Sequence, residues 1–189
     1  MEHRASPTAR ILAGMMLCTL AVGAAWAAPD VTDPDAPRSL PADGPVDVRW
    51  TDPSKFTEIR RSGNSREARR GDWVQELAEH LRKRADDRLP DGQRLEVTIT
   101  DITRAGNYEP WRGIQADSIR FMRDIYPPRI SLDFTLTGAD GGVIAQGTRE
   151  LSDIAYLQRG SPLGDSDPLR YEKRLIDDWL RKEFREPAA

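Results

Sequence analysis

Arginines and aromatic residues alternate within one irregular stretch of the chain, residues 104–129, and these are the side chains best suited to bind a ligand. Guanidinium groups hold phosphate or carboxylate through two parallel hydrogen bonds, and aromatic rings supply stacking faces and contact area. A long irregular segment inside a compact domain is often functional. The candidate ligand-binding residues are therefore Arg104, Tyr108, Trp111, Arg112, Arg120, Arg123, Tyr126 and Arg129.

The same residues also fit a structural role. The aromatic rings could close one end of the core, while the arginines pair with Glu109, Asp117 and Asp124. Both interpretations stay open. A binding role predicts that the arginines converge on a cleft, whereas a packing role predicts that protein carboxylates neutralise them in ion pairs. A second basic run, Arg60 to Arg70, is interpreted as a solvated face.

Catalytic chemistry has few candidate residues. His80 could act as a general base, but no serine lies in a G-x-S-x-G turn and the chain beyond Cys18 contains no cysteine. Zinc sites need several histidine or cysteine ligands, so we expect neither a zinc site nor any other cofactor. We interpret His80 as a residue at the margin of a helix stripe and predict no catalytic centre.

Three aspartates offer the competing enzymatic interpretation, a small metal-dependent hydrolase. Asp101, Asp124 and Asp153 each follow a strand-like stretch, and three convergent carboxylates could hold a hard cation. Their spacing matches no calcium loop, and aspartate just after a strand usually bonds nearby backbone amides. We favour turn formation for all three and predict no metal site.

These side chains need a scaffold, and residues 129–151 predict its centre. Ile130, Leu132, Phe134 and Leu136 alternate with polar residues, as in a strand with one buried face. The glycine-rich stretch 138–142 supplies a tight reversal, and residues 143–145 begin a returning strand.

Other segments repeat this logic on either side of the hairpin. Residues 46–50 and 95–100 alternate as strands, while residues 72–89 and 168–184 carry apolar stripes at helical spacing. Polar outward faces on the strands predict an α+β fold: a single domain with a mostly antiparallel sheet and two helices packed on one face.

The first 45 residues predict export and a tether. Residues 1–27 combine basic residues, an apolar run and the small-residue ending Ala25-Trp26-Ala27, which is typical of a cleavable signal peptide. Leu17 before Cys18 is atypical of a lipid-modified cysteine. Residues 28–45 contain five prolines and predict a disordered linker, so the single domain is expected over residues 46–186.

The overall charge of the chain favours no particular partner. The formal net charge of −3 is mild and gives no overall case for nucleic acid or a membrane surface. No apolar run beyond the leader approaches the ~20 residues that a transmembrane helix needs. The sequence leaves the oligomeric state open.

Four stretches occur in an order that resembles a known family. They are ITDITRAG at 99–106, IYPPRISL at 125–132, LSDIAY at 151–156 and YEKRLIDDW at 171–179. Behind a signal peptide they are similar to an uncharacterised exported family of Gram-negative bacteria, domain of unknown function 3016. Leu180 and the pair Thr103-Arg104 depart from its pattern. The resemblance implies a compartment and a single domain, and it implies no activity.

Together these observations favour a non-enzymatic periplasmic binding or accessory protein of the cell envelope that uses the segment 104–129. An envelope protein, a lipid or a glycan could be its partner. The alternatives are the hydrolase on the strand-end aspartates and a structural accessory subunit of an envelope complex, which would use an exposed sheet edge or the tether.

Overall fold

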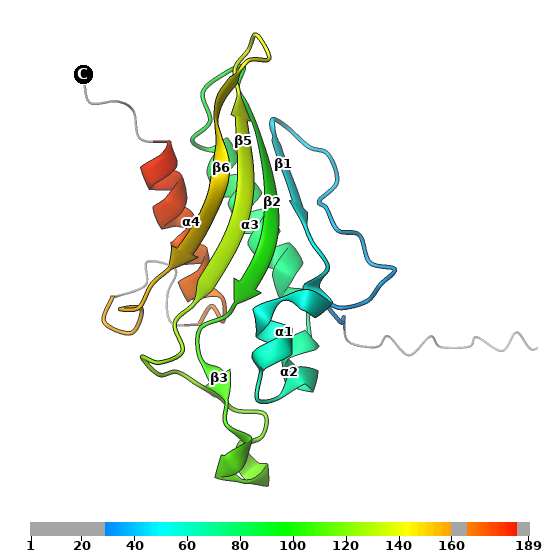
Figure 1. Cartoon of the computed structure of the whole chain (residues 1–189), viewed down its shortest axis with the longest axis vertical. Helices are drawn as coiled ribbons and strands as arrows, with labels where there is room; N and C mark the ends of the chain where they lie inside the picture. Colours follow the sequence, from blue (N-terminus) through cyan, green and yellow to red (C-terminus); the bar gives the residue numbers. More distant parts are fainter. Residues whose placement is uncertain (1–28, 160–165, 185–189) are drawn as a thin grey trace, which may run out of the picture.

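A four-stranded sheet backed by two long helices forms the body of the molecule (Figure 1). The computed structural model describes residues 29–159 and 166–184. The expected signal peptide at 1–27 lies outside the described residues. The elements are β1 (Val46–Trp50), η1 (Pro53–Lys55), α1 (Thr57–Arg61), α2 (Ser65–Arg69), α3 (Trp73–Asp86), β2 (Arg94–Thr103), β3 (Asn107–Tyr108), η2 (Pro110–Arg112), η3 (Ile114–Ala116), β4 (Arg120–Phe121), β5 (Arg129–Thr137), β6 (Val143–Ser152) and α4 (Arg170–Glu183).

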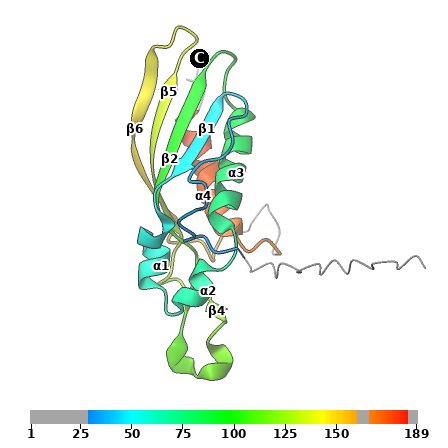
Figure 2. The same ribbon diagram turned by 90° about the vertical axis from the view of Figure 1, so that its right-hand side faces the viewer.

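The sheet has the strand order β1-β2-β5-β6 and is mostly antiparallel. Only the β1–β2 pair is parallel, because α1, α2 and α3 carry the chain from one end of β1 back to the start of β2. Figure 2 shows α3 and α4 together on one face of the sheet. The predicted α+β fold with two helices on one face is therefore confirmed.

The β5–β6 hairpin forms where alternation and glycine chemistry predicted it. Ile130, Leu132, Phe134 and Leu136 are buried on the helix-covered face. Gly138 closes the turn by donating its backbone N–H to the carbonyl oxygen of Gly142 at 2.8 Å. Gly141 has a φ of +78°, a left-handed conformation that favours glycine.

Both long helices bury the apolar stripes seen in the sequence. In α3 the buried residues include Leu77, Ala78 and Leu81, and in α4 they include Ile176 and Leu180. These stripes meet the inward side chains of the strands in one continuous core. Burial of such side chains contributes roughly 1.5–3 kcal/mol each, which makes this layer the main source of stability.

A β-bulge in β2 turns Asp101 toward the face of the sheet opposite the helices. The register between β2 and β5 shifts between Ile99 and Asp101, so that Ile99 and Ile102 are both buried while Asp101 is half-buried. Bulges of this kind re-aim a side chain at the end of a strand. This end of the sheet is where the candidate site lies.

Residues 29–45, which the sequence predicts to be part of a disordered linker, instead form a strap that lies along the outer edge of β1. Val31 and Leu40 are buried in the main core. Leu40 and Trp50 donate backbone hydrogen bonds that join this strap to the outer edge of β1, at 3.0 and 2.8 Å. Two well-placed apolar residues and short edge pairing thus hold a proline-rich stretch that cannot form a regular strand.

Two short helices, α1 and α2, occupy the arginine-rich stretch at residues 57–69. Each is five residues long, which is too short to show an apolar period. Side chains cap their first turns: the N-cap residue Asn64 accepts a hydrogen bond from Glu67 N–H in α2, and the distant Asp101 accepts one from Thr57 N–H in α1. Across residues 29–159 and 166–184, no helix combines the length and apolarity needed to cross a bilayer.

Candidate ligand-binding groove

Residues 106–126 form an arm that projects from one end of the sheet, carrying β3, η2, η3 and β4 (Figures 1 and 2). Its base is closed by the backbone hydrogen bond from Gly106 N–H to Tyr126 O at 3.0 Å and by the pairing of β3 with β4. The irregular segment singled out in the sequence is therefore an ordered excursion between β2 and β5.

Glu58 on α1 is the centre of the first arginine cluster, with only 4% of its surface exposed. The Arg104 side chain donates to Glu58 Oε1 at 3.0 and 3.2 Å, and Arg120 donates to both carboxylate oxygens at 2.8–3.0 Å. Trp73 lies beneath the Arg104 guanidinium at 4.5 Å, and Tyr108 lies beneath that of Arg120 at 5.1 Å. Two candidate ligand-binding arginines are thus used to neutralise a buried carboxylate.

Glu109, also buried, is the centre of the second cluster. Arg123 donates to its carboxylate at 2.8 and 2.9 Å, Arg112 contacts it as well, and the Tyr126 hydroxyl donates at 3.3 Å. Burial alone would raise the pKa of Glu109, but the hydrogen bond from Arg112 and the charges of Arg123 and Arg112 outweigh it, so its pKa is lowered. Burial and the neighbouring Glu109 carboxylate raise the pKa of Tyr126.

A groove of about 620 Å³ opens beside these clusters, on the face of the sheet that the helices leave free. It lies between α1, the base of the arm and the ends of β2, β5 and β6. Its walls are mostly polar. The lining residues are Thr57, Arg61, Asp101, Thr103, Gly106, Asn107, Ile125, Tyr126, Pro127, Arg129, Ser131, Glu150, Leu151 and Ser152.

Two arginines of this groove are exposed, Arg61 at the end of α1 and Arg129 at the start of β5. Within residues 29–159 and 166–184, neither guanidinium makes an ion pair or a hydrogen bond. This contrasts with Arg104 and Arg120, which pair with buried Glu58. The groove therefore offers cationic groups that no carboxylate of the described residues neutralises.

The two acidic residues of the groove differ in their contacts with the rest of the protein. The Asp101 carboxylate accepts the N–H and the hydroxyl of Thr57 at 2.6 and 2.7 Å, so it serves as a cap for α1. Glu150 lies on β6 and is exposed. Hydroxyl groups of Ser131 and Ser152 complete a surface rich in hydrogen-bonding groups.

The three aspartates go to different places, and two of them form the local bonds expected of a turn: Asp124 accepts from the N–H of Ile125 and Asp153 from that of Ala155, whereas Asp101 lies within β2 and bonds a distant residue. Asp101 caps α1, while exposed Asp124 accepts a hydrogen bond from the next residue's N–H at 3.0 Å. Asp153 is buried and pairs with Arg174 at 2.9 Å and Arg159 at 3.3 Å. In the described part of the chain, no cluster of three or more His, Cys, Asp or Glu residues is arranged to hold a metal ion.

His80 lies between the two long helices. Its Nε2 atom is 3.0 Å from Asp177 Oδ1, and Arg84 Nε donates to the same oxygen at 3.0 Å. Burial alone would raise the pKa of Asp177, but the hydrogen bonds from His80 and Arg84 outweigh it, so the pKa is lowered. This contact joins α3 to α4 and lies away from the groove.

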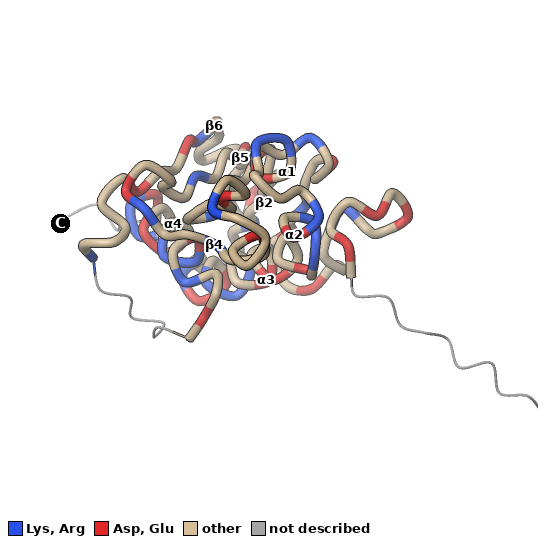
Figure 3. Tube along the Cα trace, turned by 90° about the horizontal axis from the view of Figure 1, so that it is seen from below, with Lys and Arg blue, Asp and Glu red and all other residues tan. Residues whose placement is uncertain are grey.

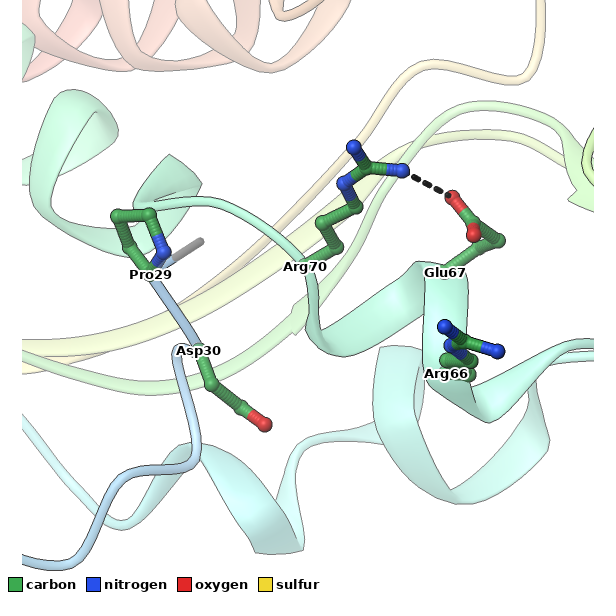
Figure 4. A pocket seen from close by; sticks show the side chains of 5 residues that line it. All are labelled: Pro29, Asp30, Arg66, Glu67 and Arg70. Atoms are coloured by element: carbon green, nitrogen blue, oxygen red, sulfur yellow. Dashed lines mark ion pairs between the residues drawn. The ribbon is translucent and has the colours of Figure 1, made fainter. Parts of the chain in front are cut away.

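A smaller cavity of about 320 Å³ lies between the start of the strap and α2, lined by Pro29, Asp30, Arg66, Glu67 and Arg70 (Figure 4). Arg70 forms an ion pair with Glu67 at 3.8 Å. Asp30 stands on the strap side of this cavity and Arg66 on the α2 side. Both cavities are lined by two acidic and two basic residues. Here Arg70 is already paired with Glu67, whereas neither groove arginine makes an ion pair among the described residues, so the larger groove is the stronger candidate for an anionic ligand.

The structure thus divides the eight candidate residues. Tyr126 and Arg129 line the groove, and Trp111 is exposed at the arm tip. The remaining five take part in the Glu58 and Glu109 clusters, either by ion pairs or, for Tyr108, beneath a guanidinium: Arg104, Tyr108, Arg112, Arg120 and Arg123. Whether any of the eight binds a ligand stays a prediction.

Arg61 is the groove arginine that is absent from the candidate residues of the sequence analysis. It belongs to the basic run 60–70, which was interpreted as a solvated face. No local pattern separates Arg61 from Arg60, because only the packing of α1 beside Asp101 places one of them at the groove.

Comparisons with known proteins bear on the family alone. A search of curated proteins found no match, and a search of solved structures also found none. A family model described as "Protein of unknown function (DUF3016)" matches residues 44–182, which covers β1 through almost all of α4. This agrees with the resemblance drawn from the four sequence stretches, and the chain belongs to the DUF3016 family.

Proposed function

We propose that this chain is a non-enzymatic binding protein of the cell envelope that holds an anionic ligand in the groove between α1 and the start of β5. The observation that carries the proposal is the presence in one groove of exposed Arg61 and Arg129, neither of which pairs with a carboxylate of the described residues. Guanidinium groups that keep their charge available are the usual means of holding a carboxylate or phosphate.

The rest of the groove supports a polar ligand with an anionic group. Thr103, Ser131, Ser152 and Asn107 offer donors and acceptors, and Tyr126 contributes a ring at the arm base. Convergent polar groups in a concave surface are typical of binding sites. Glycans with acid groups, lipid headgroups and acidic peptides share this chemistry, and the expected export places the chain among such ligands in the periplasm.

The test compares two pairs of arginines on the same face of the sheet. Arg61→Gln with Arg129→Gln removes both positive charges of the groove, whereas Arg49→Gln with Arg94→Gln removes two exposed arginines on β1 and β2, outside the groove. Immobilised wild type and variants are incubated with envelope extract, and retained lipid, glycan and protein are identified at low and high salt.

The groove variant should lose a specific ligand, and the wild type should lose the same ligand at high salt, because exposed charge interactions are screened. The control pair should retain it. A ligand set that is unaffected by both the groove substitutions and salt would contradict the proposal, as would a wild type that retains nothing.

A second candidate function is that of an accessory subunit that pairs through a sheet edge. The strap covers the outer edge of β1, but within the described residues no strand pairs with the outer edge of β6 (Val143–Ser152). A free edge can accept an extended chain from a partner. This function predicts a co-purifying protein and slower amide hydrogen exchange in β6 when that protein is bound.

A further inference from the structure

The arm ends in an exposed apolar tip. Trp111 is 71% exposed and Ile114 is 94% exposed, and Ile119 is half exposed beside them. In the described residues Trp50, Trp73 and Trp179 are buried, so Trp111 is the tryptophan that faces solvent. Large apolar side chains gathered on one projection indicate an interaction surface.

Most of the exposed large hydrophobic side chains among the described residues lie at this end of the molecule. Ile125 lies at the arm base, and Ile154 and Leu157 lie in the loop after β6, which Tyr156 ties to the arm by donating its hydroxyl to Arg123 O at 2.7 Å. The remaining exposed large hydrophobic residues, Val143 and Ile144, lie at the hairpin turn at the opposite end of the sheet (Figure 1).

The arm is held in place rather than left free. Buried Glu109 binds Arg112 and Arg123 across its base. Asn64 on the α2 side donates to the backbone oxygen of Asp117 at 3.0 Å. The tip therefore keeps its position relative to α1 and α2, and docking requires little ordering of the chain.

Basic residues are concentrated on α1 and α2 beside the arm. Residues 57–71 contain five arginines and two glutamates, and residues 104–129 contain five arginines and three acidic residues, although the whole chain has a net charge of −3. Seen from the arm end, blue stretches of α1 and α2 lie beside the arm (Figure 3). Arg60 and Arg66 are exposed there and have no ion pair among the described residues.

We propose that this end docks on the surface of an anionic lipid bilayer, with Trp111 and Ile114 entering the interfacial layer and the arginines of α1 and α2 facing the headgroups. Tryptophan is enriched at membrane interfaces, and each arginine near an anionic surface strengthens attraction to it. Exposed apolar side chains combined with basic residues are the usual features of a peripheral membrane contact.

Basic residues beside an apolar projection fit an anionic lipid surface. The tip side chains line neither of the two concave surfaces described above, so no pocket at the tip would guide a protein contact, and we favour lipid over an acidic protein partner. This docking is independent of the groove ligand, since Trp111 and Ile114 are not groove residues.

The experiment uses the chain from Ala28, the expected mature form. This chain contains every described residue and lacks the apolar leader, which would bind lipid by itself. It is mixed with vesicles of phosphatidylglycerol and phosphatidylethanolamine, or with phosphatidylcholine vesicles. Sedimentation measures binding, and fluorescence quenching by lipids brominated on the acyl chain reports entry of Trp111.

Wild type should bind the anionic vesicles and be quenched. Trp111→Ser with Ile114→Ser should weaken sedimentation about tenfold or more, because binding scales with buried apolar area. Arg60→Gln with Arg66→Gln should weaken binding to anionic vesicles and keep the quenching of the bound fraction. Val143→Ser with Ile144→Ser, at the opposite end, should bind like wild type.

Several results would overturn the proposal. Absence of vesicle binding, equal binding to phosphatidylcholine, or a tip variant that binds like wild type would each exclude lipid docking through the tip. Failure of every vesicle, together with photo-crosslinking from the tip to an acidic envelope protein, would assign the tip to a protein partner instead. Circular dichroism of each variant confirms that the fold is retained.

Discussion

The arginines at the arm end of the sheet fall into two groups, which differ in whether a protein carboxylate already binds their guanidinium groups. Arg104 and Arg120 are 14% and 16% exposed at the side chain and both bind Glu58. Arg61 and Arg129 are exposed and bind no described carboxylate. The sequence presents all four as similar basic residues, and only their burial separates those that stabilise the fold from those that can reach a ligand.

Physical chemistry explains why the first group cannot easily serve both purposes. A buried carboxylate without its cation is strongly destabilising, so the Glu58 pairs must persist in the folded state. An arginine that moved to a ligand would leave Glu58 uncompensated. The exposed pair lacks this constraint, because surface charges contribute about 0–1 kcal/mol to stability.

The largest expected effect on stability concerns Arg104 and Arg120, the pair that binds Glu58. Glu58→Gln removes the negative charge that compensates Arg104 and Arg120, and loss of one partner of a buried pair costs about 3–5 kcal/mol in the free energy of unfolding. Chemical denaturation should show this loss. Glu96→Gln is the matched control, since Glu96 is 57% exposed and pairs with exposed Arg49. Equal effects of the two changes would mean that the Glu58 cluster does not stabilise the fold.

A smaller effect concerns pH and the second cluster. The pKa of Glu109 in the folded chain lies below its ordinary value of 4.5, so its contribution to stability is complete at neutral pH. That contribution is lost as the pH falls below this value and through the folded-state pKa. Glu109→Gln should therefore be less stable at pH 7 and lose less stability than wild type between pH 7 and pH 3.

Melting temperatures measured across this pH range check the comparison. A Glu109→Gln variant with the same acid dependence as wild type would contradict the assignment of Glu109 as an acid-sensitive centre of the arm. The test does not depend on any ligand.

The smallest effect on stability is expected for the exposed pair, Arg61 and Arg129. Arg61→Gln and Arg129→Gln, singly or together, should change the free energy of unfolding by less than about 0.5 kcal/mol, because surface substitutions away from special features usually do so. Thermal unfolding followed by circular dichroism measures this. A large loss would show that these arginines also have structural partners.

The scaffold was largely predictable because its signals are local. Alternation in residues 130–136 and the glycines at 138–142 lie within one hairpin, and the stripes of α3 and α4 each lie within one helix. These patterns place the hydrophobic layer whatever the rest of the chain does. The strap was not predicted, because Val31 and Leu40 are isolated apolar residues within a proline-rich stretch.

The candidate site was predicted only in part because its chemistry depends on contacts between distant residues. Glu58 is 46 residues from Arg104 and 62 residues from Arg120 in the sequence. Glu109 was correctly considered as an arginine partner, but Asp117 and Asp124 make no described ion pair with the arm's arginines. Nothing local distinguishes a buried glutamate in a five-residue helix from an exposed one.

The most direct test of the account measures ligand retention and melting temperature for two double variants in parallel. Arg61→Gln with Arg129→Gln should keep the wild-type melting temperature and lose the retained envelope ligand. Arg104→Gln with Arg120→Gln should lower the melting temperature and, at a temperature where it is still folded, retain that ligand. A groove variant that keeps the ligand while the Arg104 and Arg120 variant loses it would contradict the account.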